Sequence, residues 1–236
     1  MKKNVMMFIL IVMAMGFTNL SAQNPFHFGV KAGLNMNNVK SSTDLLKVDE
    51  QSNTLTFGAI ISYSLIDKLM IVSGIDYIPV NSKVSFGYSS SSSSSSNNYG
   101  IITRDYKTSY LGIPVMVKAT LLPVNDKISI WGMAGVEYGF LLSAKADESF
   151  ISIKSPNLNY AKSDIDVKDD FESSFMKTNI AVGVDYAMSD KLKLFMELNY
   201  SFGLNDVYKK EYKLDNTIIS HDGKINQFGV SVGIMF

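Results

Sequence analysis

The chain alternates apolar with small or polar residues at a period of two, and this pattern is the strongest limit on its fold. The alternating segments lie at 26–36, 55–65, 69–77, 111–121, 128–142, 180–186, 192–204 and 228–236. Successive side chains of a β-strand point to opposite faces, whereas an α-helix repeats every 3.6 residues. The pattern therefore predicts eight strands, each with one apolar face.

The connections between these segments alternate in length. The short ones are 66–68, 122–127 and 187–191, each containing Asp-Lys, and the long ones are 37–53, 81–104, 145–174 and 205–223. An antiparallel meander with short turns at one end and long loops at the other is typical of outer-membrane barrels. We predict an all-β fold, an eight-stranded antiparallel up-and-down transmembrane β-barrel. The serine run at 89–96 is expected to be a flexible loop tip.

The first 22 residues have the pattern of a secretory signal peptide. Lys2 and Lys3 precede an apolar run at 5–17, and small residues follow at Ser21 and Ala22. We expect cleavage after Ala22, which leaves one barrel domain at 23–236 with a formal charge of minus two, since the removed part takes two lysines and no acids. An uncleaved anchor is the alternative, but the run is shorter than the roughly 20 residues of a membrane-spanning helix.

Alternation alone does not say which face of the barrel is outside. A soluble periplasmic lipocalin-like barrel also alternates, with its apolar face inward. Here the non-apolar face is rich in Gly, Ser and Asn, as at Gly33, Asn35, Gly183 and Ser231. Such residues suit the narrow lumen of eight strands better than a water-exposed surface. We therefore place the apolar face against lipid, with aromatic residues near the strand ends at the two membrane interfaces.

Seven charged residues share the parity of the inward face. They are Lys31, Asp76, Lys118, Glu137, Asp185, Lys193 and Glu197. An unpaired charge in a narrow lumen is strongly disfavoured, so we predict that these groups form a structural salt-bridge network that plugs the barrel. A proton or ion path is the functional alternative. Trp131 has the same parity and is expected to fill the lumen.

Five stretches together resemble the PorT-like outer-membrane β-barrel family of Bacteroidetes-type bacteria. They are FGVKAGLNMNNV at 28–39, SGIDYIP at 73–79, YLGIPVMVK at 110–118, YSFGLNDV at 200–207 and FGVSVGIMF at 228–236. The resemblance implies an eight-stranded outer-membrane barrel without general catalytic residues. One member serves a protein-secretion system. Gly112 stands where the family often has Glu, so no role of that acid is carried over. The terminal Phe236 resembles the signal that the outer-membrane assembly machinery recognises.

No catalytic, cofactor-binding or metal-binding motif is predicted. The two histidines are His27, which faces inward near one rim, and His221, which lies between Ser220 and Asp222. A rim enzyme that uses these three adjacent residues is a weak alternative, because catalytic triads are normally assembled from distant positions. The acidic stretch at 163–172 lacks the spacing of a calcium loop, and we interpret it as a solvated loop.

The leading functional hypothesis is a non-enzymatic outer-membrane barrel that maintains the membrane or displays surface loops. The alternatives are a narrow, porin-like channel for small solutes and an accessory barrel that binds partner proteins in secretion or adhesion. The expected partners are outer-membrane lipid, the assembly machinery through the C-terminal strand, and proteins at the outer loops. The balanced charge of 22 basic and 22 acidic residues gives no reason to expect nucleic acid.

Overall fold

The computed structural model describes residues 25–40, 47–48, 52–91, 97–154, 156–209, 211–214, 217–220 and 223–236. Within these ranges the chain is almost entirely β-structure, with two short 3-10 helices, η1 (Pro156–Leu158) and η2 (Lys168–Asp170). No helix in the described part of the chain is long and apolar enough to cross a membrane.

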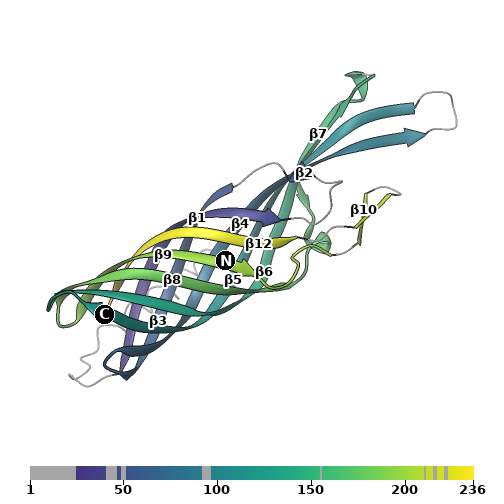
Figure 1. Cartoon of the computed structure of the whole chain (residues 1–236). Coiled ribbons are helices and arrows are strands. Elements are labelled where there is room, and N and C mark those ends of the chain that lie inside the picture. Colours follow the sequence, from purple (N-terminus) through teal and green to yellow (C-terminus); the bar gives the residue numbers. More distant parts are fainter. Residues whose placement is uncertain are drawn as a thin grey trace, which may run out of the picture.

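Eight strands close into a barrel (Figure 1). They are β1 (Phe26–Lys40), β3 (Ser52–Ile66), β4 (Leu69–Ser91), β5 (Asn97–Pro123), β6 (Ile128–Ser152), β8 (Ser174–Ser189), β9 (Leu192–Gly203) and β12 (Lys224–Met235). Each pairs antiparallel with the next in this order. The ring is closed by β1 and β12, whose register runs from Gly29 opposite Met235 to Lys40 opposite Lys224. The predicted fold class is confirmed.

Three tight connections lie at one end of the barrel, which we call the short-turn end. They are 67–68, 124–127 and 190–191. The first and last strands also meet there, because Phe28 and Phe236 exchange backbone hydrogen bonds of 3.1 and 2.7 Å. We call the opposite end, where the longer connections lie, the long-loop end.

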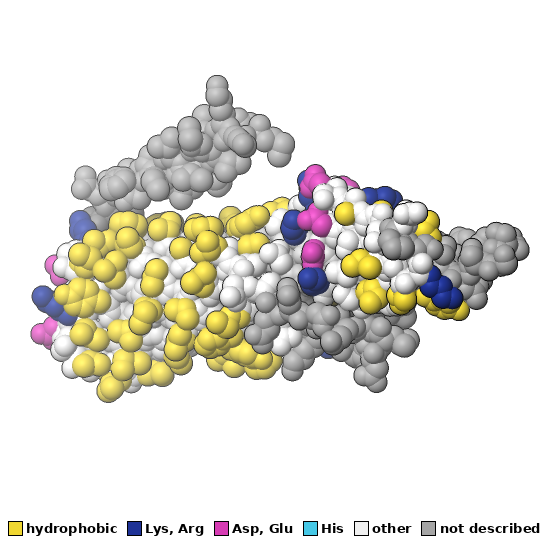
Figure 2. Space-filling model, turned by 90° about the horizontal axis from the view of Figure 1, so that it is seen from above, with side chains coloured by type: hydrophobic (Ala, Val, Ile, Leu, Met, Phe, Trp, Pro, Cys, Tyr) yellow, Lys and Arg dark blue, Asp and Glu magenta, His cyan; other side chains and the backbone are white. Residues whose placement is uncertain are grey.

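The outer wall of the barrel is apolar. Val182, Val232 and Leu34 are 53%, 56% and 60% exposed, and they come from three different strands. Figure 2 shows hydrophobic side chains spread over the barrel wall. The inward residues of the same strands include buried polar groups such as Asn35, Asp76 and Glu197. A water-soluble barrel would have the reverse arrangement, so the lipocalin-like alternative is not supported.

Exposed aromatic residues lie near both ends of this apolar wall. At the short-turn end the rings of Phe26 and Tyr63 lie 4.9 Å apart. Toward the long-loop end Tyr200 packs on Phe202, with ring centroids 4.5 Å apart, and β6 carries a similar aromatic pair. Aromatic side chains at these two levels match the girdles of membrane barrels, where rings sit at the lipid headgroups.

Three strands continue well past the apolar wall. With 23, 27 and 25 residues, β4, β5 and β6 exceed the roughly 10 residues that cross a bilayer. Their distal parts, 78–91, 97–110 and 141–152, project from the barrel (Figure 1) together with β7 (Tyr160–Asp166), which pairs with β6. We call this the extension. Two shorter elements lie near it, β2 (Lys47–Val48) on β4 and the hairpin of β10 (Glu211–Leu214) and β11 (Thr217–Ser220).

The extension corrects the predicted loops at 81–104 and 145–174, which are mostly strand. Their inward positions carry apolar residues such as Val84, Ile102, Ala146 and Phe150, and all four are buried. Most intervening positions carry Ser, Thr or charged residues, such as Lys83, Thr103 and Asp147, although Ile101 and Ile151 are also on this outer face. That polar outer face gave these segments the appearance of loops. Of the predicted serine loop tip, residues 92–96 lie outside the described residues.

A charge on the outer wall should destabilise the barrel in a depth-dependent way. Val182 lies midway along β8 between the outward residues Met176 and Met188. We expect Val182→Arg to lower the free energy of unfolding in bilayers by about 2–4 kcal/mol, and the control Met188→Arg, at the short-turn rim, by about 0–1 kcal/mol. Urea titration of both variants in lipid vesicles measures the difference. Equal losses would contradict the assignment of this face to lipid.

Candidate functional site

The seven charged residues that parity predicts to face inward line the barrel interior. They form separate groups and not one connected network. Asp76, Lys118, Glu137 and Glu197 are buried, whereas Lys31, Asp185 and Lys193 are half-buried. The short ion pairs are Lys31 with Asp76 at 3.0 Å and Lys118 with Asp185 at 2.7 Å. Glu137 instead pairs at 3.3 Å with Lys177, a residue that the sequence analysis did not include.

The Lys31–Asp76 pair spans one intervening strand. Lys31, Gly58 and Asp76 occupy consecutive positions of the same rung across β1, β3 and β4. A Cβ atom at Gly58 would collide with the Asp76 carboxylate and press on the Lys31 side chain. Gly58 therefore leaves the space through which the two charged side chains reach each other.

The Glu137–Lys177 pair belongs to a chain of polar side chains across the lumen. The Asn179 amide donates to Glu137 Oε2 at 2.6 Å, and Lys177 Nζ donates to Gln227 Oε1 at 2.5 Å. Gln227 in turn donates to Asn37 Oδ1 at 2.5 Å. Because β8 begins at Ser174, Lys177 lies inside the barrel. It shares the parity of Asn179 and Asp185. The predicted strand at 180–186 would have included it as an inward residue if its start had been placed at Ser174.

An aromatic residue and an apolar cluster fill the short-turn half of the lumen. Trp131 Nε1 donates to Asp185 Oδ1 at 2.6 Å, and Lys118 Nζ lies 4.1 Å from the centroid of the indole. Trp131 is only 1% exposed, so its predicted inward position is confirmed. The buried apolar side chains around it are Ile60, Val72, Met116, Ala181, Phe195 and Met235.

Between these layers the interior holds a cavity of about 80 Å³. This volume has room for roughly five water molecules. Fully buried side chains occupy the lumen toward both ends, with Trp131 on the short-turn side and Tyr110, Asn37 and Gln227 toward the long-loop end. The arrangement fits a filled eight-stranded barrel and does not favour a porin-like channel.

The candidate catalytic and metal-binding groups form no assembled site within the described residues. His27 is half-buried, and its Nε2 lies 3.4 Å from the Ser64 hydroxyl at the short-turn end. Ser220 ends β11, but His221 and Asp222 lie outside the described residues. No group of three His, Cys, Asp or Glu side chains with metal-binding geometry occurs in the ranges that the structure describes.

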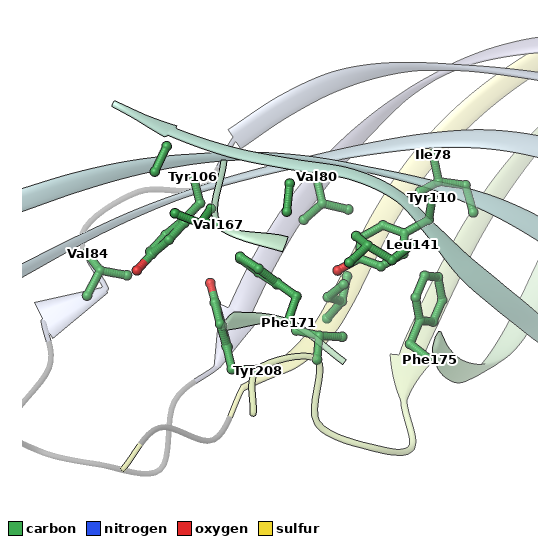
Figure 3. Close-up of a cluster of buried hydrophobic side chains, with 14 of the residues drawn as sticks. Ile78, Val80, Val84, Tyr106, Tyr110, Leu141, Val167, Phe171, Phe175 and Tyr208 are labelled. Atoms are coloured by element: carbon green, nitrogen blue, oxygen red, sulfur yellow. The ribbon is translucent and has the colours of Figure 1, made fainter. Parts of the chain in front are cut away.

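The extension shares a hydrophobic core with neighbouring elements at the long-loop end, including the ends of β8 and β12 (Figure 3). Tyr106 packs edge-on against Phe171 with ring centroids 5.4 Å apart, and Phe171 lies 4.9 Å from Tyr208. The other members are Ile78, Val80, Val84, Ile102, Tyr110, Leu141, Ala144, Ala146, Phe150, Val167, Phe175, Val207 and Ile225. A cluster of this size marks the extension as a folded part of the protein.

A buried arginine joins the segments of the extension. Arg104 on β5 donates from Nε to Glu148 Oε2 on β6 at 2.5 Å and lies 3.6 Å from Asp170 in η2. The Tyr160 hydroxyl on β7 donates to the other Glu148 oxygen at 2.8 Å. Partial burial raises the pKa of the Asp170 carboxyl, an effect that the Arg104 charge opposes. The predicted solvated acidic loop therefore contributes at least Asp170 to a structural contact.

The sequence profile of one protein family, described as outer membrane protein beta-barrel domain, matches residues 21–209. The chain belongs to this family. It is an integral outer-membrane β-barrel protein, as the apolar outer wall and the closed ring of eight strands also require. No curated protein matches it significantly.

Several solved outer-membrane proteins are similar over most of their length. OprG from Pseudomonas aeruginosa matches with 12% identity and a TM-score of 0.42, covering 92% of this chain and 99% of OprG. The attachment invasion locus protein Ail of Yersinia pestis matches with 14% identity and a TM-score of 0.38, covering 89% and 98%. Neisserial surface protein A matches with 13% identity and a TM-score of 0.41, covering 88% and 95%.

Breaking the Glu137–Lys177 pair should be costly, because both side chains are at most 4% exposed. We expect Lys177→Met to lower the free energy of unfolding by about 3–5 kcal/mol, since it leaves a buried carboxylate without its partner. Adding Glu137→Leu should recover most of the loss. The control Asp147→Ala, at the exposed Lys107–Asp147 pair, should change stability little. Urea titration in bilayers measures the wild type and the three variants. A loss for Lys177→Met as small as the control's would contradict the structural role.

Proposed function

We propose that this protein is a non-enzymatic barrel that holds a folded extension at the cell surface and presents it to a protein partner. The observation that carries the proposal is the contrast between the two parts of the molecule. Side chains fill the lumen and leave only a small cavity. The long-loop end, in contrast, carries a core of sixteen buried residues built on strands that continue from the barrel.

The extension offers an apolar surface to a partner. Ile101 on β5 and Ile151 on β6 are directly opposite each other and are 49% and 61% exposed. Tyr99 and Ile153 flank this pair and are 41% and 72% exposed. Contiguous exposed apolar side chains on a folded element commonly mark an interaction site. Lys154, whose Nζ lies 5.1 Å from the centroid of the Tyr99 ring, adds positive charge at the edge of the patch.

Within the broader family, we place the chain with the PorT-like barrels, on the five motifs that span it from 28 to 236. We also propose export with removal of residues 1–22 and recognition of Phe236 by the outer-membrane assembly machinery. The outward position of Phe236, 52% exposed on the wall that faces lipid, supports that recognition. A role in secretion or adhesion is the form of partner binding that this membership favours.

Charge on the apolar patch should abolish partner binding. We expect the double variant Ile101→Lys/Ile151→Lys to lose stoichiometric proteins that co-purify with the wild type after cross-linking on intact cells. Ser163→Lys is the control, because it adds a lysine to an exposed position of β7 in the same extension. Both variants should keep a heat-dependent shift on gels, which shows a folded barrel. A wild type that captures no protein, or a double variant that captures the same proteins, would contradict the proposal.

The filled lumen should give no steady conductance in planar bilayers. Trp131→Ala is the matched variant, because it removes the largest fully buried side chain of the barrel. We expect the wild type to stay closed and the variant to show small openings, which would demonstrate that the assay detects a passage. Steady openings of the wild type would favour the channel hypothesis instead.

A further inference from the structure

The sheet of the extension has an open edge along β4. The pairing of β4 with β3 ends at Tyr77, and β2 pairs with this edge only at Val84 and Ser85. Among the strands that the structure describes, none pairs with the next residues of this edge, 86–91. On their other edge the same residues pair one by one with β5. An exposed strand edge is a template for pairing with another chain.

The alternation of hydrogen bonds in the sheet shows which backbone groups of this edge are open. The Ile153 N–H donates to the Tyr99 carbonyl at 2.8 Å, so the backbone groups of Tyr99 face β6. Those of the next residue, Gly100, therefore face β4, where Gly100 is opposite Tyr88. Because bonding alternates along a strand, Tyr88 bonds with β5, and the N–H and C=O of Gly87 face the open edge.

Two contacts on the same edge agree with this orientation. Asn81 has the same parity as Gly87, and its carbonyl accepts a hydrogen bond of 2.6 Å from the Ser52 hydroxyl on β3. Ser85 also has this parity, and it is opposite Lys47 of β2. A short strand of the same chain thus already adds to this edge. Gly87 is the next residue whose backbone groups face away from β5.

Gly87 connects the open edge to the apolar patch of the extension. Gly87, Ile101 and Ile151 occupy consecutive positions of one rung across β4, β5 and β6. Gly87 is exposed, and a Cβ atom there would meet nothing within 4 Å. A strand added to β4 would place a residue opposite Gly87 on the same face, two strand spacings or about 10 Å from Ile101. A large side chain at that position can cover the glycine, as aromatic residues do beside edge glycines, and contact Ile101.

The opposite edge of the same sheet is protected against pairing. It is formed by β7, whose pairing with β6 is interrupted by a register shift. Asp164 of β7 has a φ of 60°, and the strand also carries Lys162 and Asp166. Bulges and charges are the means by which edge strands avoid pairing. Residues 86–91, FGYSSS, contain no charge and no proline, and their register with β5 is regular. The unprotected edge is therefore the one beside the apolar patch.

We propose that the partner is bound by strand addition. An extended segment of the partner protein pairs with β4 at 86–91 and places a large apolar side chain opposite Gly87, in contact with Ile101. This inference rests on the partner binding proposed above and names its mode. Main-chain hydrogen bonds supply the affinity, and the open space over Gly87 supplies the preference for a large apolar residue.

A synthetic peptide tests this mode directly. The probe is dye-labelled Val-Thr-Val-Thr-Phe-Thr-amide, titrated against the protein in lipid nanodiscs and followed by fluorescence anisotropy. We expect saturable binding that weakens about tenfold or more when the phenylalanine nitrogen is methylated, because its N–H faces β4 when phenylalanine is opposite Gly87. Methylation of the preceding threonine nitrogen, which faces away, is the control and should change the affinity little. Equal affinities of the two methylated peptides would overturn the proposal, and so would a parent peptide that does not bind.

A matched pair of variants tests the edge from the side of the protein. Gly87→Pro removes the N–H that the segment accepts and should weaken binding of the peptide about tenfold or more. Gly87→Ala keeps that N–H and adds a Cβ where no atom lies within 4 Å, so it should bind nearly as the wild type does. Both variants should keep the heat-dependent shift of a folded barrel. Equal binding by the two variants would contradict strand addition.

Amide hydrogen exchange, followed by NMR, locates the peptide. The Gly87 N–H should exchange quickly in the free protein and slowly with the peptide bound. The Tyr88 N–H, which bonds with β5, should exchange slowly in both states. Slow exchange of Gly87 in the free protein would overturn the proposal, because the chain itself would then occupy the edge.

Cross-linking on intact cells separates failure of this mode from failure of partner binding. Proteins lost by both Ile101→Lys/Ile151→Lys and Gly87→Pro, but kept by Gly87→Ala, would support strand addition. Proteins lost by the double variant and kept by Gly87→Pro would show docking through side chains alone, which overturns strand addition and leaves the proposed function standing. A wild type that captures no protein would remove the proposed function and this inference with it.

Discussion

The pairing of β1 with β12 is the contact on which the rest of this structure depends. Lipid offers no hydrogen-bond partners, so every strand inside the membrane must be paired on both edges. That pairing closes the sheet over the register from Gly29–Met235 to Lys40–Lys224. Closure of only eight strands then fixes the lumen as a narrow space, and this explains why inward positions carry glycine or carry charges that meet a partner.

The narrow lumen decides where large side chains fit. Gly58 leaves room for the Lys31–Asp76 pair, and Gly183 leaves room for the Trp131 ring, because a Cβ at either position would collide with those groups. The Lys31–Asp76 pair then links β1 to β4 across β3, whereas the Glu137–Lys177 pair and the Trp131–Asp185 hydrogen bond link the neighbouring strands β6 and β8. Direct contacts thus pair most of the charged groups inside the barrel.

The alternation of side chains was sufficient to predict the barrel, its strand number, its lipid-facing wall and the inward position of Trp131. It missed Lys177 because strand ends are poorly marked where Ser173 and Ser174 precede the apolar run. It also misjudged the extension, because buried residues such as Val84 and Ala146 lie between polar residues that face water. The contact of Lys31 with Asp76 depends on which positions of β1, β3 and β4 are opposite one another, and a sequence does not show this register.

Continuity of β4, β5 and β6 connects the two parts of the molecule mechanically. A loop joined to a barrel by flexible chain would lose conformational entropy when a partner orders it. Here the strands that cross the membrane also form the extension, and Arg104 ties β5 to Glu148 on β6 and to Asp170 in η2. The Ile101–Ile151 surface is therefore held before any partner arrives. Ion pairs inside the barrel hold the membrane parts of the same three strands, because they link Asp76 on β4, Lys118 on β5 and Glu137 on β6 to residues of β1 and β8.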